Sequence, residues 1–199
     1  MEALLSIDHQ LLWWIHYHLV NPLVTNFVVL FTKLINSVLF WGILILVGLV
    51  CKRTRMATIV ILLAAAVALA VGDGILKHIA QRTRPIFTGA DVAPIVPLPK
   101  ATSFSFPSGH SIVTAAMAAV AYMYHRKWGI LAGIFALVVG FSRVYAFVHY
   151  PSDVVVGLLL GAIMGVIVYR LFRRYESWSV IQKIEHVTLL PFSKKKKEE

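Results

Sequence analysis

The sequence predicts an all-α membrane protein, a polytopic bundle of transmembrane helices. Three observations favour this class: 59% of the 199 residues are hydrophobic, only 14% are charged, and the apolar residues gather in long windows. A bilayer core of about 30 Å requires about 20 apolar residues per helix. Four windows are about that long, residues 57–76, 108–124, 129–148 and 154–172.

The N-terminal part adds one further span and one ambiguous segment. Residues 34–51 form a fifth apolar window. Residues 11–31 are amphipathic at first and apolar later, with Asn21-Pro22 between the two halves. This segment could be an interfacial helix, a short span or both. The first residues are mildly acidic and do not resemble a removable signal peptide. The single cysteine, Cys51, cannot form an internal disulfide.

Most basic residues lie between the apolar windows. The net charge is +10, but a nucleic-acid-binding protein would gather its basic residues on a solvated face, so no nucleic-acid partner is expected. Three basic groups separate or follow the spans, namely Lys52, Arg53 and Arg55; Arg126 and Lys127; and Arg170, Arg173, Arg174, Lys183 and residues 194–197. The positive-inside rule makes all three cytoplasmic. Residues 1–175 are therefore predicted to form one transmembrane domain, and residues 176–199 a cytoplasmic basic tail.

Five basic residues fall on the opposite side of the predicted membrane. They are Lys77, Arg82, Arg84, Lys100 and Arg143. A single residue of this kind could simply snorkel to the interface, but five at one face indicate an anion site. The same face receives a long proline-rich connection, residues 84–107. A long irregular loop in a compact protein is usually functional or disordered.

Two stretches at this face combine histidines with groups that suit an anion. Ser108, Gly109 and His110 open a helix, whose free N–H groups and positive dipole end could bind a phosphate. Taken alone, Ser108 could equally be an ordinary N-cap. His149 and Asp153 are four residues apart at the start of the next helix, so the carboxylate could reach the imidazole. An isolated pair of this kind is more often a helix cap.

A third stretch supplies further cations. Lys77 and Arg84 lie on one short segment, and Asp73 stands one helical turn before Lys77, able to pair with it. Arg143 lies six residues before His149, and an arginine near the membrane interior is costly unless it has a partner. Three cations, a helix N-terminus and two histidines at one face suit phosphoryl transfer, which requires neutralised phosphate oxygens and in-line groups.

The three stretches resemble the signature motifs of the type 2 phosphatidic acid phosphatase (PAP2) family. They read K-x6-R-P, P-S-G-H and S-R-x5-H-x3-D, in that order, between residues 77 and 153. The resemblance implies a bundle of six transmembrane helices, of which the first is the ambiguous segment. It also implies that His149 is a nucleophile that forms a phosphohistidine, that Asp153 holds its far nitrogen, and that His110 protonates the leaving alkoxide. The implied phosphate ligands are Lys77, Arg84, Ser108, Gly109 and Arg143.

The resemblance implies a phosphatase acting on a lipid phosphate at the extracytoplasmic face of the cell membrane. The expected substrates are phosphatidylglycerol phosphate and, second, undecaprenyl pyrophosphate, with phosphatidic acid as an alternative main substrate. No cofactor is expected. No metal is expected either, because His149 and Asp153 lack further inward-facing ligands and the nearby cations would repel a divalent ion. The family's soluble haloperoxidases are a poor match for such apolar spans.

Two other classes of function remain open. An anion transporter or channel also places basic residues among its spans, although its charges should continue to the middle of the membrane. A catalytically inactive scaffold would be favoured by a missing motif residue, and none is missing. The oligomeric state is open as well, because Gly157, Gly161 and Gly165 could serve helix packing within the chain or a dimer face.

Overall fold

The computed structural model describes residues 2–89, 91–100 and 103–175, and within them the regular elements are all helices. The predicted all-α class is therefore confirmed. The order of elements is α1 (Glu2–Leu19), α2 (Pro22–Ile35), α3 (Val38–Val50), α4 (Arg55–Leu69), the π-helical η1 (Ala70–Leu76), α5 (Lys77–Ala80), the 3-10 turn η2 (Pro85–Phe87), α6 (Gly109–Tyr124), α7 (Arg126–Tyr145) and α8 (Pro151–Tyr175). The predicted tail, 176–199, lies outside the described residues.

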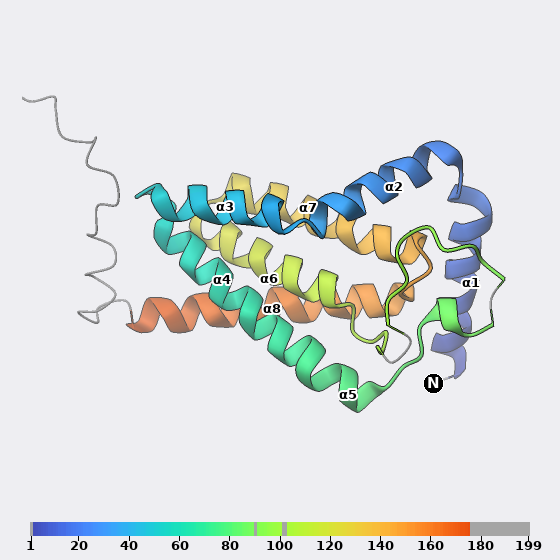
Figure 1. Cartoon of the computed structure of the whole chain (residues 1–199). Coiled ribbons are helices and arrows are strands. Elements are labelled where there is room, and N and C mark those ends of the chain that lie inside the picture. The colour runs from blue at the N-terminus through green and yellow to red at the C-terminus, as the bar shows by residue number, and fades with distance from the viewer. Residues whose placement is uncertain (1, 90, 101–102, 176–199) are drawn as a thin grey trace, which may run out of the picture.

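Helix α6 forms the centre of the bundle, with α4, α7 and α8 around it (Figure 1). Its buried residues include Ile112, Ala116 and Val120, which pack against small residues of α4 such as Ala64 and Ala68. Small side chains let the helix backbones approach closely, as is common between membrane helices. The site-bearing ends of α6, α7 and α8 are thus held in one rigid unit.

The glycine series of α8 serves this packing. A Cβ on Gly157 would lie 3.0 Å from the Ser108 carbonyl oxygen. A Cβ on Gly161 or Gly165 would collide with the carbonyl oxygens of Ile112 and Ala116. The glycines therefore face α6 within the same chain, which answers the question that the sequence left open between core packing and a dimer face.

Helix α1 lies across one end of the bundle instead of running along it (Figure 1). The chain bends by 114° between α1 and α2. Asn21 explains the bend, because its side chain caps the Val24 N–H of α2 at 3.0 Å and the following Pro22 starts that helix. The ambiguous segment 11–31 thus combines a crosswise helix with the beginning of a lengthwise one.

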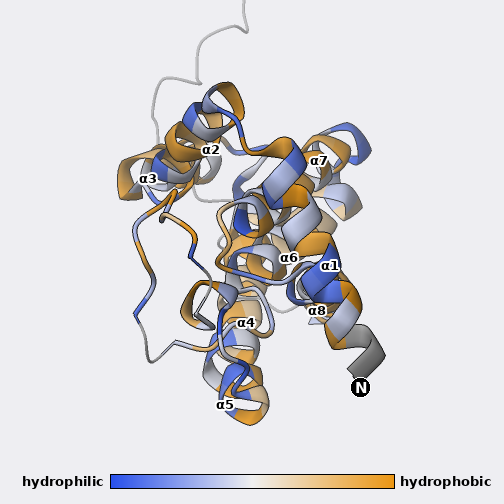
Figure 2. Ribbon diagram, turned by 90° about the vertical axis from the view of Figure 1, so that its right-hand side faces the viewer, coloured by the Kyte–Doolittle hydropathy of each residue, from blue (hydrophilic) through white to orange (hydrophobic). Residues whose placement is uncertain are grey.

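Three helical segments of the described chain are long and apolar enough to cross a membrane, namely Arg55–Phe87, Arg126–Tyr145 and Pro151–Tyr175. The bent pair α1–α2 would add a fourth, while α6 has 16 residues and α3 has 13. Many large hydrophobic side chains are exposed, and Figure 2 shows hydrophobic residues along all the long helices. The membrane class is confirmed, whereas the number of six transmembrane helices remains a prediction.

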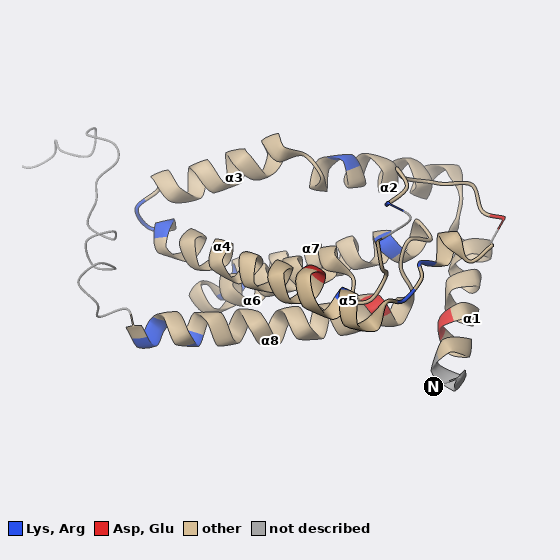
Figure 3. Ribbon diagram, turned by 60° about the horizontal axis from the view of Figure 1, so that its bottom comes forward, with Lys and Arg blue, Asp and Glu red and all other residues tan. Residues whose placement is uncertain are grey.

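Charged residues gather at the two ends of the bundle (Figure 3). One end carries the α3–α4 turn and the end of α8, including Lys52, Arg53 and Arg174. The opposite end carries α1, α5 and the connection between η2 and α6. The three motif stretches all lie at this second end, so the fold brings together segments that are up to 76 residues apart, from Lys77 to Asp153.

Candidate active site

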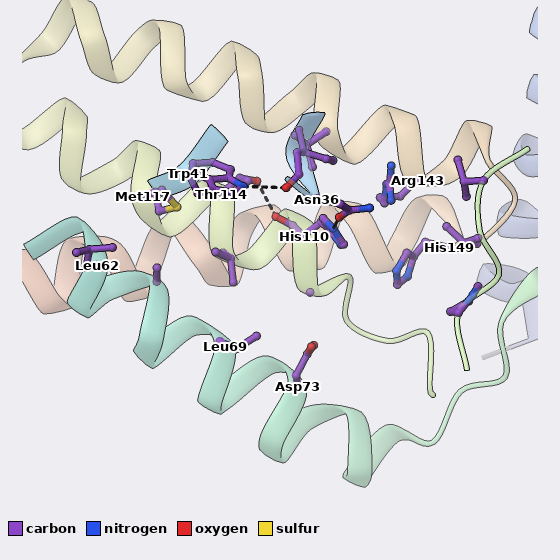
Figure 4. Close-up of a pocket in the computed structure, with 18 of the residues that line it drawn as sticks. Asn36, Trp41, Leu62, Leu69, Asp73, His110, Thr114, Met117, Arg143 and His149 are labelled. Carbon is purple, nitrogen blue, oxygen red and sulfur yellow. Dashed lines mark hydrogen bonds between the residues drawn. The ribbon is translucent and has the colours of Figure 1, made fainter. Parts of the chain in front are cut away.

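A cavity of about 780 Å³ opens among the motif residues. Six of the eight predicted site residues line it, namely Lys77, Arg84, Gly109, His110, Arg143 and His149. The other two, Ser108 and Asp153, are fully buried beside its wall. The structure thus brings all the predicted site residues to one place. Figure 4 shows His110, Arg143 and His149 converging at one end of the cavity.

Arg84 determines the form of the His149 imidazole. The Nη1 atom of Arg84 lies 3.0 Å from His149 Nε2 and also donates to the Val148 carbonyl at 2.9 Å. A guanidinium only donates hydrogen bonds, so Nε2 must accept and the imidazole proton resides on Nδ1. Burial lowers the pKa of His149 to about 4, with Asp153 opposing the shift and Arg84 adding to it. His149 is therefore neutral near pH 7, with its lone pair at Nε2.

Asp153 lies behind His149 with its carboxylate held on both oxygens. Oδ1 accepts from Arg82 Nη1 at 2.7 Å, and Oδ2 accepts from the Tyr150 backbone N–H at 2.9 Å. The distance from Oδ2 to His149 Nδ1 is 3.6 Å, slightly longer than a hydrogen bond. Nδ1 nevertheless faces this oxygen, so a small ring rotation would complete the contact that the sequence predicted.

The turn that carries His149 is unusual. Phe147 adopts a left-handed conformation with φ of 60° although it is not a glycine. Such a backbone costs free energy and persists only where surrounding contacts hold it. Phe147 is buried, and its ring packs edge-on against Trp13 of α1, with 5.1 Å between the ring centroids. Helix α1 therefore helps to hold the turn that aims His149 into the cavity.

His110 has a partner that the sequence did not reveal. Its Nε2 lies 3.1 Å from Oδ1 of Asn36, in the break between α2 and α3, and its backbone carbonyl accepts from Thr114 (Figure 4). An amide oxygen only accepts hydrogen bonds, so His110 carries a proton on Nε2. Both His110 and Asn36 line the cavity.

Arg143 meets the requirement that a buried arginine has a partner. It is 4% exposed, and its Nη2 donates to Thr32 Oγ1 at 2.5 Å, while Nε donates to Ser142 Oγ at 3.2 Å. Both partners are neutral, so the positive charge is available to an anion in the cavity. Thr32 of α2, like Asn36, had no signal in the sequence because neither residue belongs to a motif.

The start of α6 offers backbone donors to an anion. Ser108 occupies the N-cap position, but its hydroxyl accepts from Ser111 Oγ at 2.9 Å instead of capping the helix. The first N–H groups of a helix lack partners inside that helix, so those of α6 remain available. A Cβ on Gly109 would lie 2.6 Å from Asp73 Oδ1, the oxygen that pairs with Lys77, so a larger residue here would displace that carboxylate. Ser108 is thus not an ordinary side-chain N-cap, and anion binding at this helix start remains a prediction.

The remaining cations of this end differ in their surroundings. Lys77 pairs with Asp73 at 2.7 Å, as the spacing predicted, and both line the cavity. Arg82 does not line the cavity and instead bonds two carboxylates, those of Asp153 and Asp8. Lys100 is exposed on the long connection. Three of the five cations therefore line the cavity. Arg82 instead binds Asp153, which lies behind His149.

The cavity continues away from the charged groups into an apolar branch. Its lining there consists of side chains from α3, α4 and α6, including Trp41, Leu62, Leu69 and Met117 (Figure 4). One end of the cavity is therefore cationic and the other end hydrophobic. Such a shape matches a molecule with an anionic head and an apolar chain.

Comparisons with known proteins agree with this geometry. Residues 56–177 match the family model of the PAP2 superfamily. The chain is 33% identical over 140 residues to an undecaprenyl-diphosphatase of Sulfolobus acidocaldarius, covering 70% of this chain and 65% of the relative. It is 40% identical over 101 residues to phosphatidylglycerophosphatase B of Bacillus subtilis, covering 45% of this chain and 46% of the relative.

The fold also resembles a solved structure. The crystal structure of a transmembrane PAP2 type phosphatidylglycerolphosphate phosphatase from Bacillus subtilis superposes with a TM-score of 0.70 at 26% identity, covering 89% of this chain and 90% of that one. The similarity therefore extends over both the motif region and the N-terminal helices.

Proposed function

The chain belongs to the PAP2 superfamily, and from this membership we propose that it is a lipid phosphatase working through a phosphohistidine on His149. One observation carries the proposal. The unprotonated Nε2 of a neutral His149 faces a cavity that Lys77, Arg84 and Arg143 line. An unprotonated nucleophilic nitrogen beside clustered positive charge is what attack on a phosphate requires.

In the first step, Nε2 of His149 attacks the phosphorus atom. The bond from phosphorus to the leaving oxygen breaks. His110, which is protonated on both ring nitrogens when the phosphate is bound, gives its Nε2 proton to that oxygen and becomes neutral. In the structure, Arg84 donates a hydrogen bond to Nε2 of His149. When the phosphate binds, its oxygens must accept this hydrogen bond from Arg84 and so free the lone pair of Nε2. The Nδ1 proton stays on the ring, where Asp153 stabilises the positive charge that develops.

In the second step, water attacks the phosphohistidine from the face that the leaving group has vacated. Neutral His110 accepts a proton from this water, the P–N bond breaks, and inorganic phosphate leaves. The proton that His110 gave in the first step is thereby restored. Backbone N–H groups at the start of α6 and the three cavity cations hold the phosphate in line through both steps.

The apolar branch supports a lipid as the substrate. Phosphatidylglycerol phosphate and undecaprenyl pyrophosphate are the two substrates that we propose, because the similar proteins are named for them and because each joins a terminal phosphate to apolar chains. Phosphatidic acid is the alternative. A path for free anions would need polar groups beyond the cationic end, where the branch presents Leu62 and Met117 instead.

The charge distribution supports an active site that faces away from the cytoplasm. The three motif stretches lie at the end of the bundle opposite Lys52 and Arg53, and positive residues at membrane boundaries favour the cytoplasmic side. Helix α1 then also lies on the extracytoplasmic side.

The test is inorganic phosphate release by the purified protein in EDTA from each of the three lipids. We expect release by the wild type and by His125→Ala, a change in the exposed turn at the far end of α6, and none by His149→Ala. An acid-labile, base-stable phosphoenzyme should form in the wild type and in His125→Ala, but not in His149→Ala. Release that persists in His149→Ala would overturn the proposed nucleophile, and absence of release from every lipid would favour transport.

A further inference from the structure

We propose that Asp8 and Arg82 are positioning residues of this active site, through which α1 fixes the carboxylate behind the nucleophile. The inference rests on the proposed function of His149. Neither residue lines the cavity. Asp8 lies on the N-terminal helix, 74 residues from Arg82, and its sequence surroundings give no sign of a site.

Arg82 bridges two buried carboxylates. Its Nη1 donates to Asp153 Oδ1 at 2.7 Å, and its Nη2 donates to Asp8 Oδ2 at 2.7 Å. Asp153 is 0% exposed and Asp8 is 3% exposed. The guanidinium carbon also lies 3.8 Å above the centre of the Tyr150 ring. Stacking and two charge-assisted bonds leave the planar guanidinium a single orientation.

Asp8 fixes the helix that carries Asp153 as well. Its Oδ1 accepts from the Ser152 backbone N–H at 2.9 Å, and its Oδ2 forms a short hydrogen bond with the Ser152 hydroxyl. Ser152 lies in the first turn of α8, where backbone N–H groups need partners from outside the helix. An aspartate of α1 therefore caps α8 from a separate element.

The consequence for the reaction lies in the Asp153 carboxylate. Arg82 holds Oδ1 and the Tyr150 N–H holds Oδ2, so the plane of the carboxylate is fixed with Oδ2 toward His149 Nδ1. This oxygen keeps the proton on Nδ1 and the lone pair on Nε2. Without Asp8, Arg82 would be free to turn both of its outer nitrogens onto Asp153 and rotate that carboxylate.

Hydrophobic contacts hold α1 in the place that this role requires. Leu12, one turn after Asp8, is 1% exposed and packs in a cluster with Val144, Phe147 and Tyr150. Phe147 and Tyr150 belong to the turn that carries His149, and Val144 lies at the end of α7 just before it. Helix α1 therefore contacts this region in two ways: Asp8 binds the first turn of α8, and Leu12 packs against the turn that carries His149.

Asp8→Asn is the variant that tests the inference. The asparagine oxygen can still accept from the Ser152 N–H, so the α8 cap is retained, while the anionic partner of Arg82 is lost. We expect kcat for the lipid phosphate to fall about 10-fold, and about 100-fold for Arg82→Gln, with KM changed less than about 2-fold, since small misplacements of a reacting group cost this much. Gln10→Ala, on the exposed side of α1, should match the wild type.

The double variant supplies a second criterion. Because Asp8 acts through Arg82, Asp8→Asn combined with Arg82→Gln should be no slower than Arg82→Gln alone. Additive losses, or kcat of Asp8→Asn within about 2-fold of the wild type, would overturn the inference. If Asp8→Asn yields too little folded protein, Arg82→Lys replaces it as the test variant. Lysine keeps the positive charge but cannot hold two carboxylates in a fixed fork, so the same fall in kcat at unchanged KM is expected. A kcat equal to that of the wild type would overturn the inference.

The two proposals fail in distinguishable ways. If the wild type itself neither releases phosphate nor forms a phosphoenzyme, the proposed function of His149 is contradicted. If the wild type is active and Asp8→Asn forms the phosphoenzyme as fast as the wild type does, only the positioning role is contradicted. The melting temperature of each variant in detergent serves as the check that the bundle remains folded.

Discussion

At the scale of single residues, the state of His149 follows from the groups on its two sides. Arg84 cannot accept a proton, so its contact at 3.0 Å leaves Nε2 unprotonated. Asp153 faces the other nitrogen, which carries the proton. A histidine with an ordinary pKa would be partly protonated near pH 6.5 and would lose its nucleophilic lone pair. Burial and Arg84 together keep it neutral.

This neutral state predicts a stability that depends on pH. The pKa of His149 is about 4 in the folded chain and about 6.5 in an unfolded one. Between these values the unfolded chain binds more protons, so stability rises with pH from about 4 to about 6.5 and falls as the solution is acidified. Glutamine does not titrate, so His149→Gln should lack this pH-dependent contribution to the free energy of unfolding. The contribution amounts to at most about 1.4 kcal/mol per pH unit.

The measurement is the melting temperature of both proteins in detergent at several pH values. The other titratable groups are common to both proteins, so the difference between the two slopes isolates His149. A steeper acid-side slope in the wild type is expected. Equal slopes from pH 6.5 to 4.5 would mean that His149 is not held neutral by its surroundings.

At the scale of elements, the α6–α8 contact decides where the motifs meet. The second motif opens α6 and the third motif ends at the first turn of α8, so their distance depends on how closely these two helices pack. The Ser108 N–H donates to the Asp153 carbonyl at 3.1 Å, which links both helix starts directly. The three glycines of α8, at positions 157, 161 and 165, permit this approach.

Gly161→Ala should therefore destabilise the protein, and the added methyl group should push α8 away from the Ile112 carbonyl. Overpacking of this kind typically costs about 1–3 kcal/mol, and activity should fall because the motif residues separate. Gly133→Ala is the matched control. It also lies in a helix, but nothing lies within 4 Å of its Cβ, so the better helix propensity of alanine should leave stability unchanged or raise it by about 0.5–1 kcal/mol. Thermal unfolding in detergent compares the two, and equal stabilities would contradict the packing role.

At the scale of the whole molecule, the bundle has a basic end and a catalytic end. Apolar faces between them suit a bilayer, and α1 lies across the catalytic end (Figures 1 and 3). A lipid whose phosphate enters the cationic part of the cavity would keep its chains in the apolar branch between α3 and α4. Orientation in the membrane then determines which leaflet supplies the substrate.

The orientation can be tested with the single native cysteine. Cys51 is exposed in the α3–α4 turn beside Lys52, so a membrane-impermeant maleimide should label it only after intact cells are permeabilised. Asp91→Cys in a Cys51→Ser background, on the exposed connection at the other end, should be labelled in intact cells. Labelling of Cys51 in intact cells would place the catalytic end in the cytoplasm.

The sequence by itself determined the membrane class, the motif residues and the pairing of Lys77 with Asp73. These depend on composition, helical periodicity and spacings of a few residues, which local chemistry controls. Only the tertiary structure decided that α1 lies across the bundle, and that Asn36, Thr32 and Asp8 contact His110, Arg143 and Arg82. Each of these contacts joins residues at least 74 positions apart. Such contacts arise from the way helices pack against one another, which no local pattern in the chain specifies.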